Sequence, residues 1–195
     1  MAIALDRNNS FAIRHLGQLL EFIGQPEAAI PYIEKALRLN PREGAGVARG
    51  NLGACYMSVG QVDKAIGLVR QALTENPRIF WFHLVLAGAL GLNGDIDEAK
   101  TEIAASLKLK PEINSVAAWR AWMASTGLDH PGFLAQAEKS AFAGVRLAGF
   151  PDERAPRTVK PAAGAFRIRL GGRRGEQPRP AVVSRPRGWR RSASH

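Results

Sequence analysis

Three prolines recur at nearly equal intervals in the first part of the chain, and this period restricts the possible folds more than any other feature. Pro41 and Pro77 are 36 residues apart, and Pro77 and Pro111 are 34 residues apart. Twelve residues before each proline stands an alanine, and five residues before each alanine stands a glycine. These pairs are Gly24 and Ala29, Gly60 and Ala65, and Gly94 and Ala99. Such a period is typical of stacked helical hairpins, because each hairpin buries its apolar face only against its neighbours.

The small and apolar residues between these landmarks resemble the tetratricopeptide repeat, a helix–turn–helix unit of 34 residues. When the closing proline is position 32, the middle unit has matching residues at positions 7, 8, 11, 15, 20 and 27, namely Leu52, Gly53, Tyr56, Gly60, Ala65 and Ala72. The first unit supplies Leu16, Gly17, Leu20, Ala29 and Ala36. The third unit is more divergent, with Ala87 in place of glycine and Ser106 in place of alanine. The resemblance implies an all-α solenoid of about three full repeats.

The expected organisation adds a leading half repeat and a trailing pair of helices to these three units. Residues 1–9 match the end of a truncated preceding repeat, which indicates a fragment of a longer protein or an array that docks onto something else. The three repeats span 10–43, 44–79 and 80–113, C-terminal capping helices span 114–153, and a basic tail spans 154–195. We expect helices over 10–23, 26–39, 46–59, 62–75, 79–92, 95–108, 113–125 and 131–148, with a glycine ending each first helix and a proline following each second one.

A narrower resemblance lies near the end of the repeat region. The segment from Phe133 to Glu153, which closes with Gly149-Phe150-Pro151-Asp152-Glu153, is similar to the terminus of repeat modules in alphaproteobacterial signalling proteins. In those proteins the repeats follow a class III adenylate/guanylate cyclase domain or a winged-helix DNA-binding domain. The resemblance implies a module of a bacterial signalling or regulatory protein that ends near Glu153. One alternative is a regulatory fragment of a class III nucleotide cyclase whose catalytic domain is missing.

The positive charge of the chain, formally +10, lies beyond residue 153. Residues 1–153 contain 15 Lys and Arg against 16 Asp and Glu, whereas residues 154–195 contain 12 against the single acid Glu176. The second segment holds 5 of the 12 prolines and has no apolar period, so we predict that it is disordered. Its composition is also typical of out-of-frame translation of GC-rich DNA. A functional tail would bind nucleic acid or another polyanion through Arg167, Arg169, Arg173, Arg174, Arg190 and Arg191.

No group of residues in the sequence predicts catalysis, a cofactor or a metal ion. Cys55 is the single cysteine, which excludes an internal disulfide, and we interpret it as a small buried hydrophobic residue. His83 stands at a packing or groove position without a metal-binding partner at the usual spacing. The N-terminus lacks the layout of a signal peptide, and no apolar run reaches the roughly 20 residues of a membrane span. We therefore expect a cytoplasmic protein that is not an enzyme and needs no cofactor.

The function is then expected on the concave groove of the array, which the first helix of each repeat lines. Trp81 and Val85 stand at two positions where one class of these repeats has cations that grip a C-terminal carboxylate, so we do not expect that binding mode. The groove positions are instead aromatic, apolar or small, and the small ones leave room for a ligand. We predict an apolar or amphipathic peptide segment of a partner protein as that ligand. The predicted lining is Phe11, Arg14, Gln18, Phe22, Asn51, Met57, Trp81, Leu84, Trp119 and Trp122.

The same side chains have a second interpretation, in which they pack against the cap or against an upstream domain of the same parent chain. The sequence favours neither interpretation over the other. It identifies neither the partner nor the oligomeric state.

Overall fold

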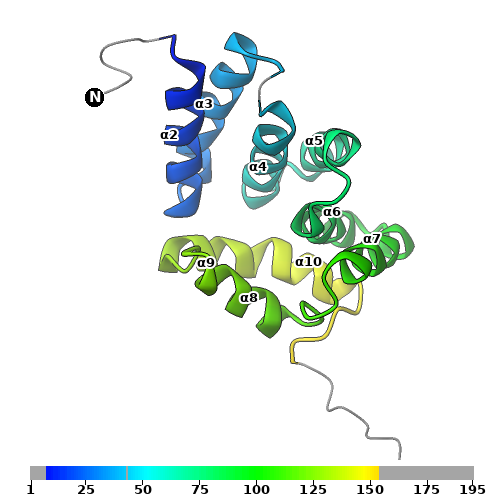
Figure 1. The fold of residues 1–195 in the computed structure, drawn as a ribbon. Helices are drawn as coiled ribbons and strands as arrows, with labels where there is room; N and C mark the ends of the chain where they lie inside the picture. The colour runs from blue at the N-terminus through cyan, green and yellow to red at the C-terminus, as the bar shows by residue number, and fades with distance from the viewer. Residues whose placement is uncertain (1–7, 43, 154–195) are drawn as a thin grey trace, which may run out of the picture. The chain divides into compact units, whose positions relative to one another are not determined.

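A computed structural model describes residues 8–42 and 44–153, and within these residues every regular element is an α-helix (Figure 1). The helices are α2 (Ser10–Phe22), α3 (Pro26–Leu39), α4 (Ala45–Ser58), α5 (Val62–Glu75), α6 (Phe80–Asn93), α7 (Ile96–Leu109), α8 (Val116–Ser125), α9 (Pro131–Lys139) and α10 (Ala141–Leu147). The all-α prediction is confirmed. The first six helices agree with the predicted ranges to within one residue at each end.

Helices α2 to α7 form three antiparallel pairs, α2 with α3, α4 with α5 and α6 with α7. Small residues let the two helices of a pair approach closely. A Cβ atom added to Gly17 would lie 2.6 Å from Ile33 Cγ1, and one added to Gly53 would lie 2.5 Å from Val69 Cγ2. In the third pair Ala87 takes this place and has no exposed surface. The predicted close packing at this repeat position is therefore present in all three pairs.

The turns within and between the pairs lie at the glycines and prolines from which they were predicted. Gly24, Gly60 and Gly94 have φ angles of 80°, 77° and 92°, a left-handed conformation that side chains on Cα disfavour. Each second helix ends two residues before a proline, which cannot donate a backbone hydrogen bond and restricts the residue before it. These prolines are Pro41, Pro77 and Pro111.

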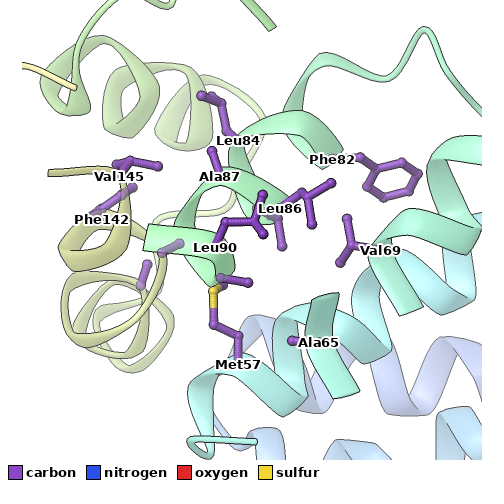
Figure 2. Packing of buried hydrophobic residues seen from close by; sticks show 14 of the residues in the cluster. Met57, Ala65, Val69, Phe82, Leu84, Leu86, Ala87, Leu90, Phe142 and Val145 are labelled. Carbon is purple, nitrogen blue, oxygen red and sulfur yellow. The ribbon is translucent and has the colours of Figure 1, made fainter. Parts of the chain in front are cut away.

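Neighbouring pairs stack along the chain, with α3 against α4 and α5 against α6. Polar contacts cross both junctions: the Tyr56 hydroxyl donates to Glu34 at 2.6 Å, and Arg70 pairs with Glu98 at 2.6 Å. One continuous hydrophobic core runs through all three pairs and on into α10. Figure 2 shows residues that α4, α5, α6 and α10 contribute to it. The arrangement is the predicted solenoid of helical hairpins.

The prediction of one helix over 131–148 is wrong, because the structure has two helices that meet at Ser140. This residue has φ −120° and ψ −91°, outside the helical region, and its hydroxyl donates to the Gln136 carbonyl at 2.7 Å. Beyond the break, α10 packs against α6. Helix α8 also begins three residues later than predicted, where the Ser115 hydroxyl accepts a hydrogen bond from the Ala118 amide at 3.1 Å.

Helix α10 lies against α6 with backbone touching backbone. A Cβ atom added to Gly91 would lie 2.0 Å from the Gly144 carbonyl oxygen, and one added to Gly144 would lie 1.9 Å from that of Gly88. Ala141 packs on Gly88 in the same way, at 2.9 Å for an added Cβ. No larger side chain fits at these glycines, so the packing depends on their lack of a Cβ atom.

Helices α9 and α10 together cross the first helices of all three pairs, as Figure 1 shows for α2, α4 and α6. At the far end, α9 meets the turn after α2, where an added Cβ at Gly132 would lie 2.5 Å from the Ile23 carbonyl oxygen. Residues after α10 return to α8, since Val116 and Ala117 donate their amides to the carbonyls of residues 151 and 152 at 2.9 Å. The C-terminal helices therefore cover the last repeat and also extend along the concave side to the first.

Candidate functional site

An apolar cavity of about 150 Å³ remains on the concave side, between the first helices of the repeats and the C-terminal helices. Its walls come from α2, α4 and α6 on one side and from α8, α9 and α10 on the other. Phe22, Trp81, Trp122 and Phe133 form part of the wall and are only half-buried, so the cavity reaches the surface beside them.

Seven of the ten predicted groove residues line this cavity. They are Gln18, Phe22, Asn51, Met57, Trp81, Trp119 and Trp122. The structure brings them together from three separate repeat units and from α8, which lie up to about a hundred residues apart in sequence.

The other three predicted residues lie elsewhere. Phe11 and Arg14 line a smaller hollow between α2, α3 and α4, where the Arg14 guanidinium lies 5.4 Å from the centre of the Phe11 ring. Leu84 has no exposed surface and belongs to the hydrophobic core that α6 shares with α10 (Figure 2).

The expectation that small residues leave the groove open is wrong for the third repeat. Gly88 and Gly91 are the small residues on this side of α6, but Ala141 and Gly144 of α10 occupy the space next to them. Trp119 is likewise buried, with its ring 5.2 Å from that of Phe142. Two glycines one helical turn apart permit a helix to pack on them, and here that helix belongs to the chain itself. The face of α6 at Gly88 and Gly91 is therefore covered by α10.

Aromatic rings dominate the cavity wall and are held in fixed positions by one another. Phe22 of α2 packs edge-on against Phe133 of α9 with the ring centres 5.9 Å apart. Trp122 of α8 packs in the same way against Phe80 at 4.8 Å. These pairs join the repeat helices to the C-terminal helices, so the shape of the cavity depends on both.

Glu21 is the acidic residue of this wall, and one of its two carboxyl oxygens is buried without a hydrogen-bond partner among the described residues. The residue is 7% exposed, and its Oε2 atom has no hydrogen-bond partner among the described residues. Burial raises the pKa of the Glu21 carboxyl to about 8, because the charged form loses its hydration. The repeat register places Glu21 on the groove side, but its burial follows from α9 and α10, which the repeat pattern does not describe.

Trp119 presents a second unpartnered polar group in the same wall. Its Nε1 atom is buried and has no acceptor among the residues that the structure describes. A buried donor without a partner is unusual in a folded protein and needs an explanation, such as water or a ligand in the cavity.

Cys55 also lines the cavity and is 1% exposed, as expected for a small buried hydrophobic residue. Burial raises the pKa of its thiol, and the nearby carboxylates Glu21 and Glu27 raise it further. The thiol therefore stays protonated at neutral pH and is a poor nucleophile. Within residues 8–42 and 44–153, no group of three His, Cys, Asp or Glu side chains is placed to hold a metal ion.

His83 lies outside the cavity, on the surface between α6 and α7. Its Nδ1 atom is 2.6 Å from Glu102 and its Nε2 atom is 3.1 Å from the Pro77 carbonyl oxygen. The hydrogen bond to Glu102 raises the pKa of His83, an effect that partial burial opposes. The pair links α6 to α7. This position agrees with the interpretation of His83 as a packing residue.

The tail arginines Arg167, Arg169, Arg173, Arg174, Arg190 and Arg191 lie outside the described residues, as does the predicted disorder of 154–195. Among the helices that are described, none combines the length and the apolar character needed to cross a lipid bilayer.

Comparison with known proteins supports the repeat architecture. The tetratricopeptide repeat family matches the sequence over residues 24–78, which spans the first two closing prolines. No curated protein matches the chain.

Several solved structures of the protein MamA are similar in fold. One MamA crystal structure has a TM-score of 0.54 at 20% identity, and the similarity covers 79% of this chain and 83% of that one. MamA from Desulfovibrio magneticus RS-1 gives 0.54 at 17% identity, over 74% and 80% of the two chains. A MamA structure designated AMB-1 gives 0.50 at 25% identity, over 74% and 82%. The described helices thus form a tetratricopeptide-type solenoid.

Proposed function

We propose that the chain is a protein-interaction module that holds an apolar or amphipathic segment of a partner protein on its concave side. Tetratricopeptide-type solenoids use their concave surface for binding, and this one has an aromatic cavity there. The main support for the proposal is that seven of the ten residues predicted to line a groove line this one cavity. We propose no chemical step, because among the described residues the buried Cys55 thiol is protonated and the cavity lining contains no acid–base pair.

Helices α9 and α10 limit how much of a partner the concave side accepts. They cover Gly88 and Gly91, so the third repeat offers no free groove for a long helix. The cavity of about 150 Å³ matches the size of one anchoring side chain, because an engineered cavity of about 150 Å³ takes up a single benzene molecule. We therefore place one anchor residue of the segment in the cavity and its neighbours across the half-buried rims of Phe22, Trp81 and Trp122.

The parent context follows from the resemblance of the segment Phe133 to Glu153. We assign the module to a bacterial cytoplasmic signalling or regulatory protein, in which an upstream domain of the same chain is a second possible source of the bound segment. A cyclase-type parent would place the catalytic residues outside this sequence.

The test is selection of binding peptides from a random 12-residue library on the full chain, followed by variants of the cavity. Trp81→Ala and Trp122→Ala are expected to weaken the selected peptides at least tenfold, because aromatic anchors carry most of the energy of such interfaces. Leu147→Ala is the matched control, since Leu147 is 62% exposed on α10 and does not line the cavity. Circular dichroism establishes that each variant is folded.

Two outcomes would contradict the proposal. One is a library that yields no binder. The other is a set of binders that folded Trp81→Ala and Trp122→Ala variants retain with unchanged affinity. If Leu147→Ala were the only variant that lost binding, the binding site would instead lie on the outer surface of α10.

A further inference from the structure

The cavity wall contains one acidic group whose burial the repeat pattern does not explain. Glu21 is its one carboxylate, and no Lys, Arg or His side chain lines it. The Glu21 side chain is more than nine-tenths buried, and its Oε2 atom has neither an ion pair nor a hydrogen bond among the described residues. A carboxyl group in such a place is costly unless something donates to it.

We propose that the anchor which enters the cavity is an alkylammonium group, carried by a lysine side chain of the partner segment, and that it pairs with Glu21. This inference rests on the proposed function and names the chemistry that the module recognises. An ammonium group supplies the hydrogen-bond donors and the positive charge that the unpartnered carboxylate lacks.

The walls suit the rest of a lysine side chain. Trp81, Trp119, Trp122, Phe22 and Phe133 surround the space with aromatic rings, and methylene groups pack on such rings while an ammonium group is attracted to their faces. The four-carbon stem of lysine fits a cavity of about 150 Å³ and leaves space for a water molecule, which occupies about 30 Å³.

Other chemical classes fit less well. An anion would face Glu21 without any cation in the wall to receive it. A purely apolar anchor would leave the Glu21 carboxyl group without a partner. A guanidinium group is planar and larger than an ammonium group, so it fits a cavity of about 150 Å³ less well.

Small probes test the cavity without a partner. We would titrate n-butylammonium, n-butanol and n-butyrate into the full chain and follow the indole N–H signals by NMR, because three of the four tryptophans line the cavity. We expect n-butylammonium to bind at least tenfold more tightly than n-butanol, with no detectable binding of n-butyrate. Glu21→Gln should weaken n-butylammonium at least tenfold. The matched control is Glu27→Gln, which removes the same charge from an exposed residue nearby and should change the affinity less than twofold.

The selected peptides test whether the amine belongs to a partner. We expect them to contain a lysine next to apolar residues, and replacement of that lysine by norleucine should weaken binding at least tenfold on the natural chain but not on Glu21→Gln. The inference would be overturned if the selected peptides contained no basic residue and bound Glu21→Gln as tightly as the natural chain. The proposed function would then remain intact.

The remaining outcomes are also decisive. Binding of n-butylammonium without any selected peptide would assign the cavity to a free amine and refute the partner lysine together with the proposed function. Equal binding of n-butanol and n-butylammonium, unchanged in Glu21→Gln, would show that Glu21 acts only as a neutral acid and would refute the ion pair.

Discussion

Glu21 places a carboxyl group in an apolar wall, and the fold must lose stability when that group ionises. Its pKa is about 8 in the folded chain against 4.5 in the unfolded chain. A raised carboxyl pKa means that the folded state holds the proton more tightly, so this contribution to stability is complete below pH 4.5 and is lost as the pH rises through 8. Glu21→Gln does not ionise and should be more stable than the natural chain at pH 9 by ~2–5 kcal/mol, with little difference at pH 4.5.

Urea unfolding at pH 4.5, 7 and 9 measures this difference. Glu27→Gln is again the control, because Glu27 is exposed on α3 and its removal should leave the pH dependence of the natural chain in place. If the free energy of unfolding of Glu21→Gln changed with pH in the same way as that of the natural chain, the carboxyl group would have to be hydrated through the cavity mouth.

His83 and Glu102 contribute to stability in the same pH direction but through an ion pair. The raised pKa of His83 means that its contribution is complete below about pH 6.5, the usual value for histidine, and is lost as the pH rises through the folded value. Their side chains are 14% and 19% exposed, so the pair is partly shielded from water. Glu102→Gln should cost about 1–2 kcal/mol at pH 6 and less at pH 9.

Glu98→Gln provides the matched comparison for this pair. Glu98 and its partner Arg70 are 44% and 52% exposed, so the loss of this ion pair should cost less than about 1 kcal/mol. Equal costs for Glu102→Gln at pH 6 and pH 9 would contradict a charged His83 in the folded chain.

At the scale of helices, the packing of α6 on α10 depends on missing side chains. A Cβ atom at Gly91 would lie 2.0 Å from the Gly144 carbonyl oxygen, and backbone cannot move aside as the end of a side chain can. Gly91→Ala should therefore destabilise the chain by about 2–3 kcal/mol and speed amide hydrogen exchange in α10. Gly67→Ala in α5 is the control: an added Cβ meets nothing within 4 Å there, so this substitution should stabilise by about 0.5–1 kcal/mol.

The same packing explains which elements the sequence predicts and which it does not. The repeat helices follow from local signals, since Gly60 ends α4 with positive φ and Pro77 follows α5, and they were predicted to within one residue. The break at Ser140 has no such signal, because a serine in a run of helix-forming residues is compatible with a continuous helix. It depends on the packing of α10 against α6.

The cavity shows the same division between local and tertiary information. The repeat register selects Gln18, Asn51 and Trp81 for the concave side, and they line the cavity. The register cannot say that α9 and α10 fold back over that side, so it predicted open space at Gly88 and treated Leu84 as a lining residue. Leu84 is instead fully buried. The burial of Glu21 was missed for the same reason.

At the scale of the whole molecule, charge separates two parts of the chain. Residues 1–153 have one more acid than base, whereas residues 154–195 have 12 bases and one acid. Binding to nucleic acid or another polyanion, the alternative function that the tail sequence suggests, must then depend on the tail rather than on the repeats. Binding of this kind is not specific for sequence, because it comes from phosphate charge.

The last prediction compares two triple substitutions that remove equal charge from the two parts. Arg167, Arg169 and Arg173 changed together to Ala should weaken binding of a 20-base-pair DNA duplex at 50 mM salt by at least tenfold. Lys64, Lys100 and Lys108 are exposed on α5 and α7, and their replacement by Ala lowers the net charge equally but should change the affinity less than threefold. Fluorescence anisotropy over a salt series measures both, and the slope of log K against log salt should become shallower by about 0.9 for each phosphate that the variant no longer neutralises. Equal decreases in affinity for the two variants would mean that net charge alone controls the binding, and the tail would then have no distinct role as a binding segment.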